Sequence, residues 1–137
     1  MNDQELTAWV LEFIREVDSL QRKYAPRLLD RRQTPPAVFD AYHREMDALY
    51  ARFLTSRERH CFYFGLSDPP VFTALEDAPD SAAERKGNRA AITFLSRTGQ
   101  LDFCFRLRCK GGTWRIDSVQ QRVRTARRTY RWEYGSF

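Results

Sequence analysis

A small number of side chains in this sequence have the types and spacing that acid–base chemistry requires. His43 and Asp47 are four residues apart, which places two side chains on the same side of a helix and could form a proton-transferring pair. Their neighbours Tyr42 and Met46 occupy the apolar positions of the same segment, so the simpler prediction leaves the pair on the solvent side. His60 has no carboxylate at a recognisable spacing. Catalysis by these groups is therefore the less favoured alternative.

Two carboxylates of the C-terminal half are further candidates. The strand register expected below pairs Asp117 with Arg106 and places Asp102 beside Gln121. Side chains that face each other across antiparallel strands commonly form structural contacts, and exposed ion pairs contribute little free energy. We therefore expect both carboxylates to be structural.

The cysteines and glycines indicate neither a metal centre nor a cofactor site. Cys61, Cys104 and Cys109 are odd in number and include no CxxC pair. Cys104 and Cys109 are an odd number of residues apart in one expected strand, so they point to opposite faces and cannot bridge each other. Gly111-Gly112 has no helix behind it, unlike a phosphate-binding loop. We expect no cofactor and no metal.

Charge is distributed unevenly along the chain. Residues 1–84 contain 10 basic and 15 acidic side chains, whereas residues 85–137 contain 13 basic and 3 acidic ones. Of the 23 basic residues, 20 are arginine, whose guanidinium suits paired contacts with carboxylates or phosphates. A GC-rich coding bias would give the same excess, and both explanations stay open. For a binding surface, the candidate partner-binding residues are Arg106, Arg108, Arg115, Arg122, Arg124, Arg127, Arg128, Asp77 and Asp80.

The arginines near the C-terminus alternate with aromatic side chains. Tyr130 and Trp132 are interleaved with the arginines of residues 122–131, a composition typical of a tail that follows phosphates and stacks on bases. The same cluster suits docking on an acidic protein, where opposite charges would speed association. The acidic residues of the segment 76–84 offer the opposite charge, either to a basic partner or to the arginines themselves.

The elements that would hold these side chains begin with a helix. From Asp3 to Tyr24 the apolar residues recur at the 3, 4, 7 spacing of one helical face. Asn2 or Asp3 can cap this helix, and Pro26 is expected to help end it.

A second helix is predicted after Thr34, a capping residue followed by two prolines suited to a first turn, and it should reach residue 54 or 55. Beyond it the pattern changes from helical to alternating. Three shorter segments are expected: a strand at 61–66, a strand or short helix at 71–75, and a mobile loop at 76–84.

Three strands are predicted in the C-terminal half, at Arg89–Ser96, Leu101–Cys109 and Thr113–Val123. Thr98-Gly99 and Gly111-Gly112 suit the tight turns between them and fix the register. Residues 125–137 are expected to add a fourth strand or a docked tail. The expected opposite pairs are Cys109 with Trp114, Leu107 with Ile116, Phe105 with Ser118, Phe94 with Phe103, and Ile92 with Phe105.

Two amphipathic helices followed by an antiparallel meander predict one α+β domain over residues 1–137, with the helices packed on one face of a curved sheet. Residues 103–117 (FCFRLRCKGGTWRID) resemble the last hairpin of the nuclear transport factor 2-like superfamily. Within it, residues 13–16 (FIRE) and 64–72 (FGLSDPPVF) resemble the bacterial immunity proteins of polymorphic toxin systems. The resemblance implies a cone-shaped, cystatin-like domain.

The same resemblance implies a function without chemistry, which is to bind a cognate toxin domain and occlude its active site. The alternatives are a small-molecule-binding or isomerase/dehydratase-type enzyme of this fold, and an arginine-rich nucleic-acid-binding protein. A homodimer through the sheet could use Leu95, Cys104 and Val119. Asp3 and Glu5 stand where a secretory signal would be basic, and no apolar run is long enough to span a membrane, so a cytoplasmic location is expected.

Overall fold

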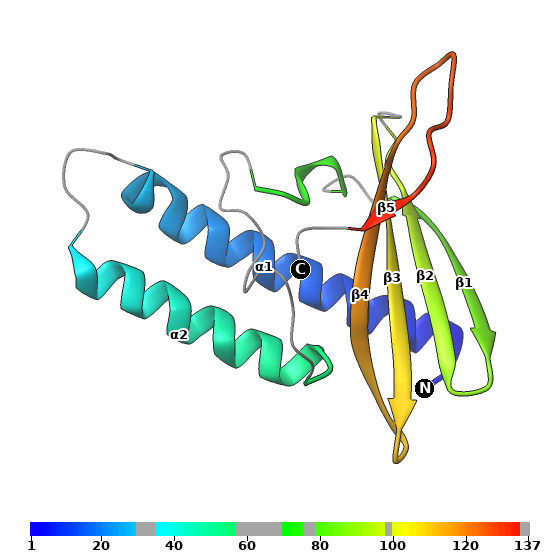
Figure 1. The fold of residues 1–137 in the computed structure, drawn as a ribbon, viewed down its shortest axis with the longest axis horizontal. Coiled ribbons are helices and arrows are strands. Elements are labelled where there is room, and N and C mark those ends of the chain that lie inside the picture. Colours follow the sequence, from blue (N-terminus) through cyan, green and yellow to red (C-terminus); the bar gives the residue numbers. More distant parts are fainter. Residues whose placement is uncertain (30–34, 57–69, 76–78, 98–99, 135–137) are drawn as a thin grey trace.

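The computed structural model describes residues 1–29, 35–56, 70–75, 79–97 and 100–134 of the chain. Helix α1 (Asp3–Leu28) and helix α2 (Pro36–Phe53) lie side by side and run in opposite directions (Figure 1). Both pack on an antiparallel sheet, which establishes the predicted α+β class. The cone shape stays a prediction. The sheet order β1-β2-β3-β4-β5 follows the chain, with strands β1 (Asp80–Lys86), β2 (Arg89–Leu95), β3 (Leu101–Lys110), β4 (Thr113–Val123) and β5 (Glu133–Tyr134).

Helix α1 starts with a capping box. The side chain of Asn2 accepts a hydrogen bond from the backbone N–H of Glu5, and the Glu5 side chain accepts one from Asn2. The prediction that Pro26 ends the helix is wrong, because α1 continues to Leu28. The proline removes one backbone donor in the last turn, but the nearby Tyr24 is buried and its ring packs at a tilt against Tyr42 of α2, with 5.2 Å between the ring centroids.

Helix α2 ends at the edge of the sheet. Its N-cap is Pro35, without a side-chain cap, while Thr34 and the strand predicted at 61–66 lie outside the described residues. After the helix, Leu54 forms a parallel bridge with Ile116 of β4, and the backbone N–H of Thr55 donates to the carbonyl of Ile116 at 2.9 Å. This bridge joins the helical layer to β4. The segment 71–75, predicted as strand or short helix, contains the 3-10 helix η1 at Thr73–Leu75.

Phenylalanine rings fill the space between the helices and the sheet. Phe13 of α1 lies 5.4 Å from Phe53 of α2 and 6.3 Å from Phe105 of β3, measured between ring centroids. Such pairs contribute free energy beyond the area they bury. Among the described residues, six phenylalanines are less than 2% exposed: Phe13, Phe53, Phe72, Phe94, Phe103 and Phe105.

The register agrees with the prediction near the turns and departs from it at a β-bulge. Leu107 faces Ile116, as predicted, and the Cys109–Trp114, Phe94–Phe103 and Ile92–Phe105 pairs are also confirmed. Phe105, however, faces Val119, and Arg106 faces Ser118, so the predicted Phe105–Ser118 and Arg106–Asp117 pairs are wrong. The cause is the bulge, in which Asp117 is an extra residue of β4 and shifts the following register by one.

Part of the segment predicted as a mobile loop is strand β1. Asp80–Lys86 pairs with β2 along its whole length, joined by a turn in which Gly87 has a φ of 61°. The alternation rule missed this strand because Ala83 is the single residue of β1 that is not exposed. The Gly87-Asn88 pair, a hairpin-turn dipeptide, was the usable indication.

The C-terminal segment returns along β4. Arg124 bridges Thr129 around a turn, and β5 then pairs with Gln120 and Gln121. The described part of this segment thus adds a short strand next to β4, which is the first of the two predicted alternatives. Within the described ranges, neither long helix combines the length and apolar character that crossing a membrane requires.

Candidate functional site

The strand register places four cationic side chains in one row across the sheet. Lys86 of β1 lies opposite Arg89 of β2, Arg89 opposite Arg108 of β3, and Arg108 opposite Arg115 of β4. We call these residues the basic row. The neighbouring Leu107 is buried among the core residues, so alternation places the row on the outer face, which is turned away from the helices. Like charges directly opposite each other are destabilising, so this arrangement is unusual.

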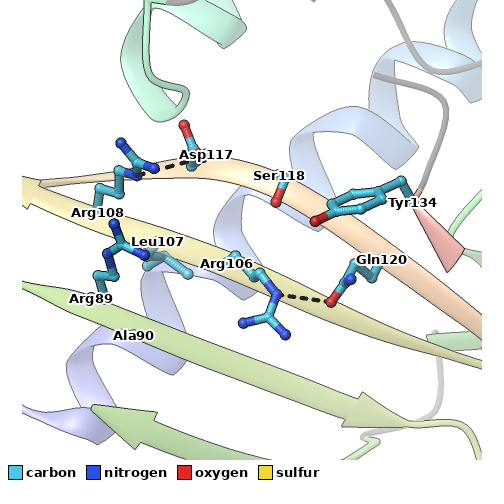
Figure 2. A pocket seen from close by; sticks show the side chains of 9 residues that line it. All are labelled: Arg89, Ala90, Arg106, Leu107, Arg108, Asp117, Ser118, Gln120 and Tyr134. Carbon is cyan, nitrogen blue, oxygen red and sulfur yellow. Dashed lines mark hydrogen bonds and ion pairs between the residues drawn. The ribbon is translucent and has the colours of Figure 1, made fainter. Parts of the chain in front are cut away.

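A depression of about 300 Å³, the outer hollow, lies beside this row (Figure 2). Arg89 and Arg108 lie at one end of it, and Gln120 and Tyr134 lie toward the other. The bulge at Asp117 bends β4 beside the hollow, and bulges commonly redirect side chains in this way. Its lining residues are Arg89, Ala90, Arg106, Leu107, Arg108, Asp117, Ser118, Gln120 and Tyr134.

Most of the guanidinium donors in the outer hollow are uncommitted. Arg106 donates through Nε to Oε1 of Gln120 at 2.8 Å, and Nε of Arg108 lies 3.7 Å from Oδ2 of Asp117. Neither contact uses the terminal nitrogens of the arginine. Arg89 is exposed, and within the described ranges no hydrogen bond or ion pair engages it. The hollow therefore contains several positively charged guanidinium N–H groups that are available to donate hydrogen bonds to a ligand.

Of the described residues that line the outer hollow, Asp117 is the one carboxylate. Besides the contact with Arg108, its Oδ1 accepts a hydrogen bond from the hydroxyl of Thr55 at 2.8 Å. Its partners thus include Arg108 and Thr55, whereas the predicted partner Arg106 donates to Gln120. Asp117 links the basic row to the end of α2, which is a positioning contact.

A second depression, of about 650 Å³, adjoins the outer hollow and shares Arg108 and Asp117 with it. Lys110 and Arg115 contribute further positive charge there, and the Arg115 guanidinium donates to the backbone carbonyl of Arg52 at the end of α2. The two depressions together extend the basic surface from β2 to the helix α2.

Two of the predicted partner-binding arginines instead hold a buried carboxylate. Asp102 of β3 is fully buried, and its Oδ2 lies 3.0 Å from Nε of Arg122 and 2.9 Å from Nε of Arg124. The backbone N–H of Ser96 donates to Oδ1 at 3.0 Å. Asp102 also faces Arg122 across the strands, not Gln121 as predicted, because of the bulge.

Burial alone would raise the pKa of the Asp102 carboxyl, but the hydrogen bonds from Arg124, Arg122 and Ser96 together lower this pKa below its usual value. The guanidinium of Arg122 also lies 4.3 Å from the ring centroid of Trp132. This cluster ties the C-terminal segment to the sheet. Arg122 and Arg124 are therefore unsuitable for charge reversal as a probe of binding.

The remaining predicted partner-binding residues lie apart from the outer hollow or outside the described ranges. Arg127 and Arg128 are exposed at the turn after β4, and the Arg128 guanidinium lies 4.4 Å from the ring centroid of Tyr130. Asp80 is exposed at the start of the edge strand β1, and Asp77 lies outside the described residues.

Sequence reasoning selected Arg106, Arg108 and Arg115, which the structure brings together, but missed Arg89 and Lys86. Arg89 could have been found, because the predicted register of β2 against β3 places it opposite Arg108. Lys86 could not be found without β1.

The groups considered for catalysis do not converge on the outer hollow. His43 and Asp47 are exposed on α2, and His60 lies outside the described residues. Cys104 is buried and Cys109 half-buried in β3, on opposite faces as predicted. The described part of the chain contains no group of three His, Cys, Asp or Glu side chains that could hold a metal ion.

Comparison of the chain with protein-family models, with curated proteins and with solved structures found no match.

Proposed function

We propose that this chain is an inhibitor that binds a cognate toxin domain through the outer face of its sheet and blocks the toxin's active site. The proposal has two supports. One is the resemblance of residues 103–117 to the last hairpin of the nuclear transport factor 2-like superfamily, and of residues 13–16 and 64–72 to its bacterial immunity proteins. The other, which carries the choice of surface, is the basic row beside the outer hollow.

The chemistry of this face favours an acidic protein surface as its partner. Arginine is enriched at protein interfaces, because one guanidinium can form paired hydrogen bonds with a carboxylate and also pack through its plane. Opposite charges would also accelerate the encounter of the two proteins. Nanomolar affinity corresponds to about 12 kcal/mol, which an interface of standard size can provide when it contains a few well-packed anchors.

The contacts of the candidate acids favour binding over catalysis. Asp117 contacts Arg108 and Thr55 at the rim of the outer hollow, and none of the described residues that line this hollow is a histidine. His43 and Asp47 lie on the exposed side of α2. We therefore propose that the chain performs no chemistry of its own.

Nucleic acid is the less favoured partner. The guanidinium of Arg122 lies against Trp132, and that of Arg128 lies against Tyr130. Each arginine thus occupies one face of an aromatic ring that could otherwise stack on a base.

The test uses the cognate toxin domain, to be sought among the products of the neighbouring genes and produced in a laboratory bacterium with and without the chain. We expect the wild-type chain to restore growth and to bind a catalytically inactive form of the toxin. The double variant Arg89→Glu and Arg108→Glu should bind this form at least roughly tenfold more weakly by calorimetry. Both arginine side chains are exposed, and the 3.7 Å contact of Arg108 with the half-buried Asp117 is too long to contribute much stability, so the variant should fold.

The matched control is the double variant Arg15→Glu and Arg97→Glu, which makes the same change of charge at two exposed arginines outside both depressions. It should protect as well as the wild type. If both double variants lose the same amount of affinity for the toxin, the interface does not lie on the outer face. If the wild-type chain neither protects the bacterium nor binds the toxin, the inhibitor function is refuted.

A further inference from the structure

The geometry points to an oxyanion-binding site in the outer hollow, where Arg89, Arg106 and Arg108 together hold one phosphate or carboxylate group. This is a property of the isolated chain and requires no toxin. The site combines an unfavourable arrangement of charge, oriented donors and a cavity of suitable size.

The first observation is repulsion that an anion would relieve. Arg89 and Arg108 lie directly opposite each other on neighbouring strands, and Lys86 and Arg115 extend the same row on both sides. Like charges directly opposite each other on neighbouring strands destabilise the sheet. A doubly charged oxyanion between the guanidinium groups would convert this repulsion into attraction.

The second observation is that one of the three guanidinium groups is already oriented. Gln120 accepts a hydrogen bond from Nε of Arg106 at 2.8 Å, which fixes one edge of the planar group and leaves its terminal nitrogens for a ligand. Asp117 lies 3.7 Å from Nε of Arg108, too far for a hydrogen bond, so it attracts this guanidinium without fixing its orientation. Orientation in advance reduces the conformational entropy lost on binding, which favours affinity for a small ligand.

The third observation is the size and lining of the cavity. A volume of about 300 Å³ equals the share of about ten water molecules in the liquid. An oxyanion with a few attached atoms fits such a space. Hydroxyl groups of Ser118 and Tyr134 lie on the β4–β5 side, across from the arginines of β2 and β3, and can donate to further ligand oxygens (Figure 2).

Two sources could supply this chemistry: a free or small-molecule phosphate, and an acidic side chain of a protein. The experiment therefore titrates the isotope-labelled chain separately with inorganic phosphate and with glutarate, at constant ionic strength maintained with sodium chloride. Chemical shifts of the backbone amides of β2, β3 and β4 report binding. We expect saturable shifts around Arg106 and Arg108, with tighter phosphate binding identifying a phosphorylated ligand and tighter glutarate binding identifying a protein carboxylate.

The double variant Arg89→Gln and Arg108→Gln should bind the preferred anion at least roughly tenfold more weakly. The variant Arg15→Gln and Arg97→Gln should retain wild-type affinity, and circular dichroism should give the same spectrum for all three proteins. Shifts that fail to saturate for both anions, or equal affinity in the two double variants, would overturn the site. Because the toxin is absent, this result is separate from the success or failure of the inhibitor proposal.

Discussion

Asp102 lies buried between β3 and the C-terminal segment, where two arginines and one backbone N–H surround its carboxylate. Removing one partner of a buried ion pair is costly, because the remaining charges lose the interactions that compensated their desolvation. Arg122 and Arg124 are themselves partly exposed, with side chains 23% and 31% accessible, so water recovers part of that loss. A single carboxylate thereby controls the attachment of the segment after β4.

We predict that Asp102→Asn lowers the free energy of unfolding by about 2–4 kcal/mol at neutral pH. The pKa of Asp102 is lowered in the folded protein, so the wild-type stabilisation is complete above the unfolded-state pKa of about 4 and is lost as pH falls through the folded-state pKa. The difference in the free energy of unfolding between variant and wild type should therefore shrink as the pH falls below about 4. Urea unfolding of both proteins at a series of pH values measures this difference.

Asp80→Asn is the matched control, because it removes a carboxylate from an exposed position at the start of β1. It should change stability little at any pH. A difference between Asp102→Asn and wild type that stays constant down to the acid limit would contradict the role assigned to the buried carboxylate.

At the scale of elements, the β3–β4 hairpin depends on two glycines. Gly111 and Gly112 have φ values of 59° and 79°, a pair that fits a type I′ turn, and a Cβ at either position would meet no atom within 4 Å. Substitution there would therefore introduce backbone strain without a steric clash. This turn sets the register that aligns Arg108 with Arg115.

We predict that Gly112→Ala reduces the free energy of unfolding by about 1–2 kcal/mol, the cost of a left-handed backbone in a residue with a Cβ. Thr113→Ala, at the exposed neighbouring position, is the control and should have a smaller effect. Urea unfolding measures the free energy of unfolding of both variants and of the wild type. A loss for Gly112→Ala no larger than that of the control would indicate that the turn relaxes into another conformation.

The elements that were predictable are those in which apolar alternation and turn glycines agree. Strand β4 was predicted with its bounds correct, and β2 and β3 to within one residue. The bulge was missed although the sequence contains an indication of it, since Ile116 and Val119 both face the core across an odd interval. Burial of Asp102 could not be inferred, because no local pattern distinguishes a buried acid from an exposed one. This is why Arg122 and Arg124 were assigned to a binding surface.

At the scale of the whole molecule, the outer face affects self-association. The predicted homodimer used Leu95, Cys104 and Val119, but Val119 is 1% exposed and faces the helices, and Cys104 is 5% exposed. Two copies stacked through their outer faces would also bring two basic rows together. We therefore predict a monomer at low ionic strength, where repulsion between exposed charges is least screened.

Sedimentation equilibrium at two salt concentrations measures this prediction. Reversal of charge by Arg89→Glu and Arg108→Glu should weaken the repulsion, and the Arg15→Glu and Arg97→Glu variant provides the control. A wild-type dimer that persists at low salt would contradict a repulsive outer face.

The strand order also determines when the core can form during synthesis. Because each strand pairs with its neighbour along the chain, the sheet can grow one hairpin at a time, with short loop closures. The helices leave the ribosome first, and the apolar face that carries Phe13 and Phe53 then has no sheet to cover it. The core cannot close until Val119 of β4 has emerged. During synthesis, the interval in which the two helices have emerged without the sheet is therefore the one in which exposed apolar surface most needs the protection of a chaperone.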